Sequence, residues 1–228
     1  MIISGIVKSS LVDYPGMVAG VLFVPGCNYN CFYCHNRSLL DGTHDELDLQ
    51  AIKDFLKKRA GLLDGIVITG GEPTFQKGLI SYIREIKSLG YKVKLDTNGS
   101  SPLLIAQLLH EGLCDYYAVD YKAPSARYQE ICGSKANADT VLKTIGLLLD
   151  EHANFEVRTT VIPQLDEDDL ICMAEELPVV PRYVLNRYRF PEQYLPDDHD
   201  RIMKKPYTQS QIDIFKKIIQ NRQPNILI

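Results

Sequence analysis

Three cysteines on one short stretch of the sequence have the spacing of a metal site. Cys27, Cys31 and Cys34 fall within eight residues in the pattern CxxxCxxC, and three thiolates on one loop can converge on one metal centre. A structural zinc site would take a fourth ligand, either His35 or a remote residue. Three thiolates around a cubane instead leave one iron open to an outside ligand. The spacing therefore favours an iron–sulfur cluster, with zinc as the alternative.

A second motif, TGGEPT at residues 69–74, ends the next apolar run along the chain. Gly70 and Gly71 allow the backbone to approach a ligand closely, and Pro73 stiffens the exit from the loop. A tight connection between a strand and a helix would use the same residues. The motif alone leaves both interpretations open.

Charged and polar side chains end the two strands predicted next. Asp96, Thr97 and Asn98 lie in LDTNG, which is also a good turn sequence because Asx side chains bond nearby backbone groups. Asp120 and Lys122 are two residues apart in VDYK, so a strand would place both on one face. Barrels of parallel strands bind ligands at the strand C-terminal ends, which makes both motifs candidates. A solvated ion pair is the alternative for VDYK.

Arg158 lies in the alternating run EVRTTV at residues 156–161. Alternation places Glu156, Arg158 and Thr160 on one face of a strand. An inward arginine needs an anion, which could be a bound carboxylate, Glu156 or Asp120. A ligand site and a structural ion pair both remain open.

Short β-branched runs alternate with amphipathic stretches, which is typical of a parallel α/β fold. The predicted strands are 18–24, 65–69, 92–96, 116–120, 155–161 and 183–188, and the predicted helices are 48–59, 78–89, 102–111, 139–149, 166–176 and 208–221. Six βα units are too few for a closed eight-stranded barrel, so we expect an incomplete (β/α)6 three-quarter barrel. We assign residues 1–190 to this domain and 191–228 to a loop and a C-terminal helix packed on it.

Composition limits the partners and the compartment. The formal net charge of −4 gives no electrostatic case for nucleic acid. No apolar run could span a bilayer and the N-terminus lacks the pattern of a signal peptide, so we expect a cytoplasmic protein without a membrane partner. Cys114, Cys132 and Cys172 are scattered singly, and we expect them to be ordinary buried residues rather than disulfide partners.

The run CNYNCFYCHN, with Tyr33 before its last cysteine, resembles the signature of the radical S-adenosylmethionine (SAM) superfamily, and TGGEPT resembles the GGEP element of that family. The resemblance implies that Cys27, Cys31 and Cys34 hold a [4Fe–4S] cluster whose open iron chelates SAM. Reductive cleavage of SAM would then give methionine and a 5'-deoxyadenosyl radical that abstracts hydrogen. It disfavours zinc and implies a partial barrel of radical SAM type.

LDTNG, VDYK and the strand that carries Arg158 extend the resemblance to the glycyl-radical-enzyme activating family over about residues 1–190. SLVDYPG at residues 10–16 looks closest to activating proteins of anaerobic ribonucleoside-triphosphate reductases. The implied cofactor contacts are Tyr33 near the adenine, Gly70, Gly71 and Glu72 near the methionine amino group, and Asp96, Thr97, Asn98 and Asp120. Of the last four, Asp96, Thr97 and Asp120 would lie near a monovalent cation beside the methionine carboxylate. Lys122 and Arg158 would lie near that carboxylate or the substrate loop.

The implied partners are a glycyl radical enzyme, foremost an anaerobic ribonucleotide reductase, and an electron donor of flavodoxin or ferredoxin type. No cysteine lies between Cys34 and Gly70 or after Cys172, so no further cluster is expected. The histidine that some activases carry on the last strand has no counterpart at residues 188–190. A small-molecule radical SAM enzyme, such as a 7-carboxy-7-deazaguanine synthase, is the main alternative, and a non-enzymatic iron–sulfur or zinc-binding module is the third.

Overall fold

The computed structural model describes residues 1–228, which form two compact units. The first unit comprises Met1–Asn28, Ser38–Thr97 and Leu103–Ala118, and the second comprises Tyr29–Arg37, Asn98–Pro102 and Val119–Ile228. Within both units, strands that follow one another in the sequence are neighbours in the sheet. None of the helices is both long and apolar enough to cross a membrane.

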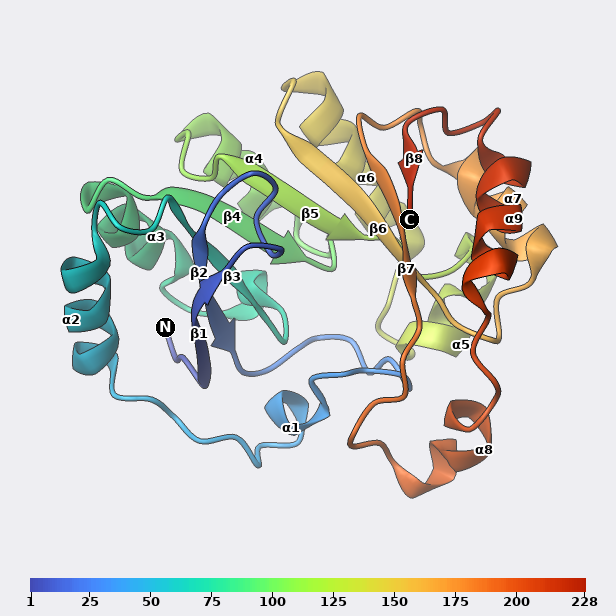
Figure 1. Cartoon of the computed structure of the whole chain (residues 1–228), viewed down its shortest axis with the longest axis horizontal. Helices are drawn as coiled ribbons and strands as arrows, with labels where there is room; N and C mark the ends of the chain where they lie inside the picture. The colour runs from blue at the N-terminus through green and yellow to red at the C-terminus, as the bar shows by residue number, and fades with distance from the viewer. The chain divides into compact units, whose positions relative to one another are not determined.

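The first unit alternates strands with helices (Figure 1). Its elements are β1 (Gly5–Ser10), β2 (Ala19–Val24), α2 (Leu49–Arg59), β3 (Gly65–Gly70), the 3-10 turn η1 (Pro73–Phe75), α3 (Leu79–Ser88), β4 (Lys92–Thr97), most of α4 (Pro102–His110) and the start of β5 (Tyr116–Asp120). The short helix α1 (Arg37–Leu40) begins at the boundary of the two units. Strands β2, β3 and β4 are parallel, and β1 pairs antiparallel with β2.

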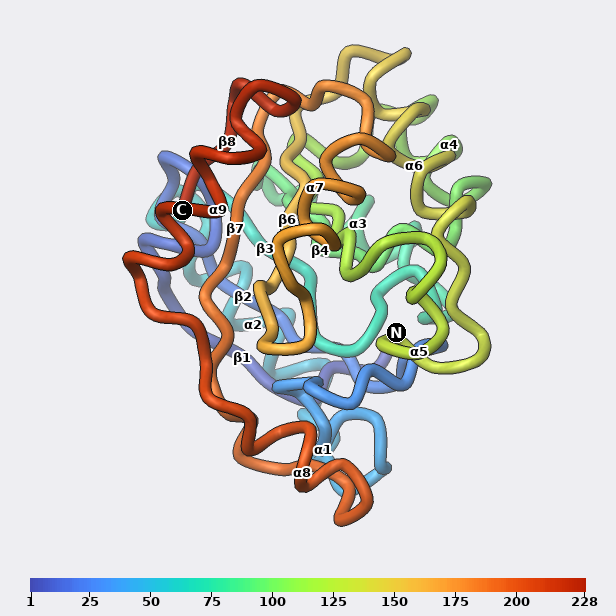
Figure 2. Tube along the Cα trace, turned by 90° about the vertical axis from the view of Figure 1, so that its right-hand side faces the viewer, coloured from blue at the N-terminus to red at the C-terminus, as the bar shows by residue number.

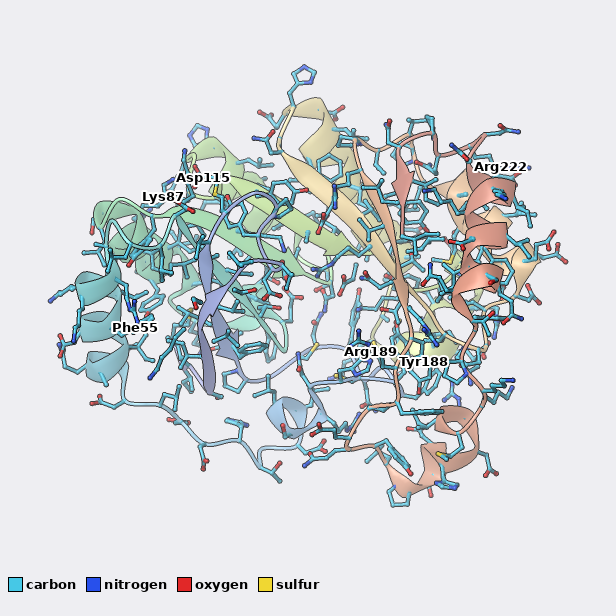
Figure 3. All side chains as sticks on the ribbon, viewed as in Figure 1. Phe55, Lys87, Asp115, Tyr188, Arg189 and Arg222 are labelled. Atoms are coloured by element: carbon cyan, nitrogen blue, oxygen red, sulfur yellow. The ribbon has the colours of Figure 1, made fainter.

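Local sequence explains these elements. The Asp48 side chain caps α2 by accepting from Gln50 N, and the apolar face of the helix buries Ile52 and Leu56. At the start of β4 and β5, the Asp115 carboxylate accepts from Lys87 Nζ at 2.7 Å and from Val93 N at 2.8 Å (Figure 3). Asp115 thereby links the start of β5 to β4 and to α3.

The second unit continues the alternation. Its elements are the end of β5, η2 (Ser125–Arg127), α5 (Tyr128–Cys132), α6 (Ala138–Asp150), β6 (Phe155–Val161), α7 (Glu167–Glu176), β7 (Tyr183–Arg187), η3 (Pro196–Asp198), α8 (His199–Ile202), α9 (Gln209–Ile219) and β8 (Ile226–Leu227). Strands β6, β7 and β8 are parallel. Figure 2 shows α9 running near β7, and the helix contacts both β7 and α7.

Two helices of the second unit begin with complete capping boxes. Asp166 and Asp169 cap α7 reciprocally, and Thr208 and Gln211 do the same for α9. These pairs fix where each helix starts, close to the predicted boundaries.

The predicted α/β class and its six βα repeats are confirmed. Every predicted strand and helix is present with ends within two residues of the expected ones, and β5 and β6 match at both ends. The elements not predicted are short: β1, α1, α5, α8, β8 and the 3-10 turns. Strand β1 escaped prediction because its central residues are exposed and leave no alternating apolar pattern.

Candidate functional site

The predicted cysteine ligands are divided between the two units. Cys27 belongs to the first unit, whereas Cys31 and Cys34 belong to the second. Cys34 N donates to the Cys31 carbonyl at 3.2 Å, so these two residues lie on one tight turn. Within neither unit do three or more His, Cys, Asp or Glu side chains gather closely enough to hold a metal ion. The three-cysteine site therefore remains a prediction from the sequence.

Cys132 lies beside Cys31 in the second unit. Asn30 N donates to the Cys132 carbonyl at 2.9 Å, which holds the end of α5 against the cysteine loop. The side-chain hydrogen bond with Cys132 lowers the pKa of Cys31, whereas burial raises the pKa of Cys132. A lowered pKa favours the thiolate, which is the form that ligates metals. Cys132 is buried as expected, but nothing in its sequence surroundings indicated that it would neighbour a candidate ligand.

Residues 29–37, which we call the cysteine loop, are held by a bond within the loop and by partners from distant parts of the second unit. Arg37 Nη1 donates to Asn30 Oδ1 at 2.6 Å, and Arg201 Cζ lies 3.8 Å from the centre of the Phe32 ring. The Tyr33 ring packs edge-on against Tyr188 at 6.5 Å. Tyr188 follows β7, and Figure 3 shows it next to Arg189.

Tyr33 is a predicted cofactor contact with an unsatisfied hydroxyl group. Its side chain is buried, and its hydroxyl has no hydrogen-bond partner. Burial raises the pKa of Tyr33 well above its usual value, so the phenol stays neutral. Buried hydroxyls without partners are uncommon and indicate a place where a ligand or water can bind. Together with the thiol donors at Cys31 and Cys34, this group fits a cysteine loop that receives a cofactor.

The TGGEPT loop is packed tightly against the residues before Cys27. Gly71 N donates to Val24 O and Glu72 N donates to Gly26 O, both at 2.8 Å. A Cβ at Gly71 would lie 2.0 Å from Gly26 O, and one at Gly70, where φ is +120°, would lie 2.5 Å from Val24 O. Both glycines are therefore required by backbone packing within the first unit, whatever ligand the loop binds.

Glu72 anchors this loop from its buried side chain. Its Oε1 accepts from Thr74 N at 3.0 Å, from Thr74 Oγ1 at 2.6 Å and from Thr97 Oγ1 at 2.7 Å. The last bond joins the loop after β3 to the end of β4. The structure thus brings Glu72 and Thr97, two predicted cofactor contacts, together in the first unit.

Asp96, also at the end of β4, pairs with a lysine that was not among the predicted site residues. Lys94 Nζ lies 2.6 Å from Asp96 Oδ1, and only 2% of the Lys94 side chain is exposed. The two residues share one strand face because they are two apart. The same rule predicts the pair in VDYK, and it could have identified Lys94.

The Asn98 side chain stabilises a turn after β4. Its Oδ1 accepts from Ser100 N at 2.9 Å, and Gly99 follows with φ at +73°. This is the Asx turn that the LDTNG sequence allows.

Asp120, Lys122 and Arg158 form one ion cluster in the second unit. Asp120 Oδ2 lies 2.9 Å from Lys122 Nζ, and Asp120 Oδ1 lies 3.0 Å from Arg158 Nε. Burial raises the pKa of Asp120, but the charges and hydrogen bonds of Lys122 and Arg158 outweigh it and lower the pKa to about 2. Of the anions considered for Arg158, Asp120 is in contact with it, while Glu156 accepts from Arg182 Nε at 2.9 Å.

Residues 21–177 match a protein-family model described as the Radical SAM superfamily. A "Putative glycyl-radical enzyme activating enzyme" of Methanocaldococcus jannaschii is 34% identical over 202 residues, which cover 85% of this chain and 82% of that protein. A "Probable GTP 3',8-cyclase" of Pyrococcus abyssi is 27% identical over 146 residues, which cover 63% of this chain and 47% of that protein.

Solved structures show the same fold at low sequence identity. Streptococcus suis SuiB bound to S-adenosylmethionine has a TM-score of 0.63 and 15% identity, and the match covers 88% of this chain and 48% of SuiB. The chain thus spans about half the length of SuiB and of the cyclase.

Proposed function

The chain belongs to the radical SAM superfamily, and on this basis we propose that it activates a glycyl radical enzyme. Members of the superfamily use a [4Fe–4S] cluster and SAM, and a structural neighbour is described as bound to SAM. The observation that carries the proposal is the 34% identity to a protein named as a glycyl-radical enzyme activating enzyme, because that match covers more than four fifths of both chains.

Cys27, Cys31 and Cys34 would hold the cluster. When bound, the cluster supplies the electron that cleaves SAM to methionine and a 5'-deoxyadenosyl radical. The packed aromatic rings of Tyr33 and Tyr188 would exclude water from the cysteine loop. The hydrogen bond with Cys132 lowers the pKa of Cys31, which favours the thiolate form that ligates metals.

Asp120, Lys122 and Arg158 would bind and orient a ligand rather than exchange protons with it. The pKa of Lys122 is raised well above its usual value, since Asp120 and other nearby groups outweigh the effect of burial. Asp120, with a pKa of about 2, stays ionised at neutral pH. A net positive cluster of Lys122 and Arg158 around Asp120 suits the carboxylate of SAM or the backbone of a substrate loop.

The proposed substrate is a glycine in a partner protein, foremost an anaerobic ribonucleotide reductase. The electron would come from a donor of flavodoxin or ferredoxin type. A small-molecule reaction is the second candidate, and the identity to a cyclase named for GTP supports it over 63% of the chain. The small-molecule reaction is the weaker candidate, because the cyclase is less identical to this chain than the activating enzyme is and the match covers less of both proteins.

Electron paramagnetic resonance distinguishes an activase of a glycyl radical enzyme from a small-molecule enzyme. Reduced, reconstituted protein should be mixed anaerobically with SAM and an anaerobic ribonucleotide reductase from the same genome. We expect a carbon-centred doublet that forms together with methionine and 5'-deoxyadenosine, and that disappears when the radical-site glycine of the reductase is changed to alanine.

Two variants test the cluster, and the substrate test separates the two candidate functions. Cys31→Ala should lose the cluster iron, whereas Cys114→Ala should keep it. A protein that gives no doublet with any glycyl radical enzyme of its host, but turns over a purine nucleotide or pterin-like substrate, would contradict the activase proposal.

A further inference from the structure

Cys132 is a buried nucleophile that the proposed function does not use. It ends α5, is 0% exposed and is a free thiol. Cys31, the cysteine beside it, is 8% exposed and is also a free thiol. Both belong to the second unit, so their contact lies within one compact part of the molecule. Of the two residues, only Cys31 has surface that a small solute can reach.

Three contacts align α5 with the cysteine loop. Asn30 N donates to the Cys132 carbonyl at 2.9 Å. The ring centres of Tyr29 and Tyr128 lie 6.3 Å apart. Tyr128 and Cys132 are four residues apart and therefore share one face of the helix, and on that face the Cys132 thiol hydrogen-bonds to the sulfur of Cys31. Backbone and ring contacts next to the two cysteines thus hold their sulfur atoms in contact.

Cys34 is the other candidate partner for Cys31, because the two residues form a CxxC pair. Cys34 N donates to the Cys31 carbonyl at 3.2 Å, which joins the two residues through their backbones. The Cys132 thiol instead meets the Cys31 sulfur directly. Two cysteines can form a disulfide only if their side chains can meet without backbone movement. The structure therefore favours Cys132 over Cys34 as the partner.

We propose that Cys31 and Cys132 form a reversible disulfide in the cluster-free protein when a peroxide oxidises it. The Cys31 sulfur attacks one peroxide oxygen and breaks the O–O bond, which gives a sulfenic acid and water. The Cys132 sulfur then displaces the hydroxyl group, so that the S–S bond forms and a second water leaves. Two electrons and two protons thus pass from the thiols to one hydrogen peroxide, which becomes two waters.

This disulfide makes cluster assembly depend on redox conditions. Cys31 in a disulfide cannot ligate iron, because the thiolate is the form that binds metals. The disulfide also stops oxidation at a step that a dithiol reverses, whereas sulfinic and sulfonic acids are not reversed in this way. Oxidised protein is thereby kept in a form from which the cluster can be rebuilt. This consequence rests on the proposed role of Cys31 as a cluster ligand, whereas disulfide formation itself does not.

Peptide mapping of the cluster-free protein tests the pairing and needs no variant. The reduced protein is treated with hydrogen peroxide, and the remaining thiols are blocked under denaturing conditions. Trypsin and chymotrypsin together release Cys132 within residues 129–135 and Cys31 within residues 30–32, apart from the other cysteines. We expect mass spectrometry to find these two peptides joined by a disulfide. A disulfide from Cys31 to Cys34 or Cys27, or no disulfide at all, would overturn the inference.

Cys132→Ala tests the protective role, and Cys172→Ala is the matched control. The Cys172 thiol donates to Glu176 Oε1 at 3.6 Å instead of to a cysteine. The proteins are treated with peroxide, reduced with dithiothreitol and reconstituted. We expect the parent and Cys172→Ala to recover most of their iron, and Cys132→Ala to recover at least about twofold less.

The melting temperature and the iron content before oxidation establish that each variant is folded and can be loaded. Equal recovery of iron in all three proteins would contradict the protective role of the disulfide. Neither experiment uses SAM or a partner enzyme, so each can fail while the radical transfer test succeeds.

Discussion

The TGGEPT loop of the first unit and the cysteine loop of the second unit both carry predicted site residues, yet they are held in different ways. The TGGEPT loop is held mainly through its backbone: Gly71 N and Glu72 N donate to Val24 O and Gly26 O, and Gly71 packs on Gly26. The cysteine loop is held by Cys132, Tyr188 and Arg201, which come from far along the chain. The first loop is thus held mainly by close backbone contacts, and the second by one backbone bond and by side-chain rings packed around it.

The largest effect is expected at Gly71, where the backbone of Gly26 leaves no space for a side chain. Gly71→Ala would put a Cβ 2.0 Å from Gly26 O, a backbone atom that cannot rotate away. We expect a loss of about 3 kcal/mol or more in the free energy of unfolding, measured by urea denaturation. The variant would also disturb the residues that lead to Cys27, so reduced SAM cleavage in it would not by itself show that Gly71 touches SAM.

Gly90→Ala is the control for this prediction. Gly90 has φ at +88°, and a Cβ added there would meet no atom within 4 Å, so only backbone strain of about 1–2 kcal/mol is expected. If Gly71→Ala were no less stable than Gly90→Ala, the close packing of Gly71 on Gly26 would be wrong.

A smaller effect is expected at the tertiary contact of the cysteine loop. Gly133 follows α5 with φ at +92°, and its Cβ would lie 3.1 Å from Asn30 Cβ. Gly133→Ala should cost about 1–2 kcal/mol through strain and push Asn30 away from the end of α5. We therefore expect less iron per chain after reconstitution, measured by colorimetric iron assay.

Gly112→Ala provides the comparison, because Gly112 also has a positive φ of +60° but no neighbour within 4 Å. It should lose stability and keep its iron. Equal iron in the two variants would show that the contact between Asn30 and residue 133 does not support the cluster.

The range of each sequence pattern explains what could be predicted. The strands, the helices and the loops that carry TGGEPT and LDTNG were predictable because periodicity, caps and turn residues act over a few positions. The pair of Asp120 and Lys122 was predictable for the same reason, since two residues on one strand share a face. The pairing of Cys132 with Cys31 was not, because α5 is only five residues long and no local pattern connects it to the cysteine loop.

The smallest effect is expected at Arg201, which covers the cysteine loop from α8. Its guanidinium lies 3.8 Å from the Phe32 ring centre, and Arg201 Nη2 also donates to the Glu130 carbonyl at 3.1 Å. Arg201→Lys keeps the charge but loses the flat surface that stacks on the ring, so we expect a loss of about 0.5–1 kcal/mol. The readout is amide hydrogen exchange, which should accelerate in residues 29–37 because an outer contact of that loop has been weakened.

Arg59→Lys is the matched control in the first unit. Arg59 Cζ lies 5.9 Å from the ring centre of Phe55, which Figure 3 labels on α2, so its interaction with the ring is weaker and remote from the loop. Exchange in residues 29–37 should be unchanged in this variant. If Arg201→Lys left that exchange unchanged as well, α8 would contribute nothing to the cysteine loop, and α5 together with Tyr188 would have to hold it. If exchange rose instead in residues 69–74, the two loops would not be held by separate sets of contacts, because Arg201 would then stabilise a loop that the backbone contacts to Val24 and Gly26 are expected to hold.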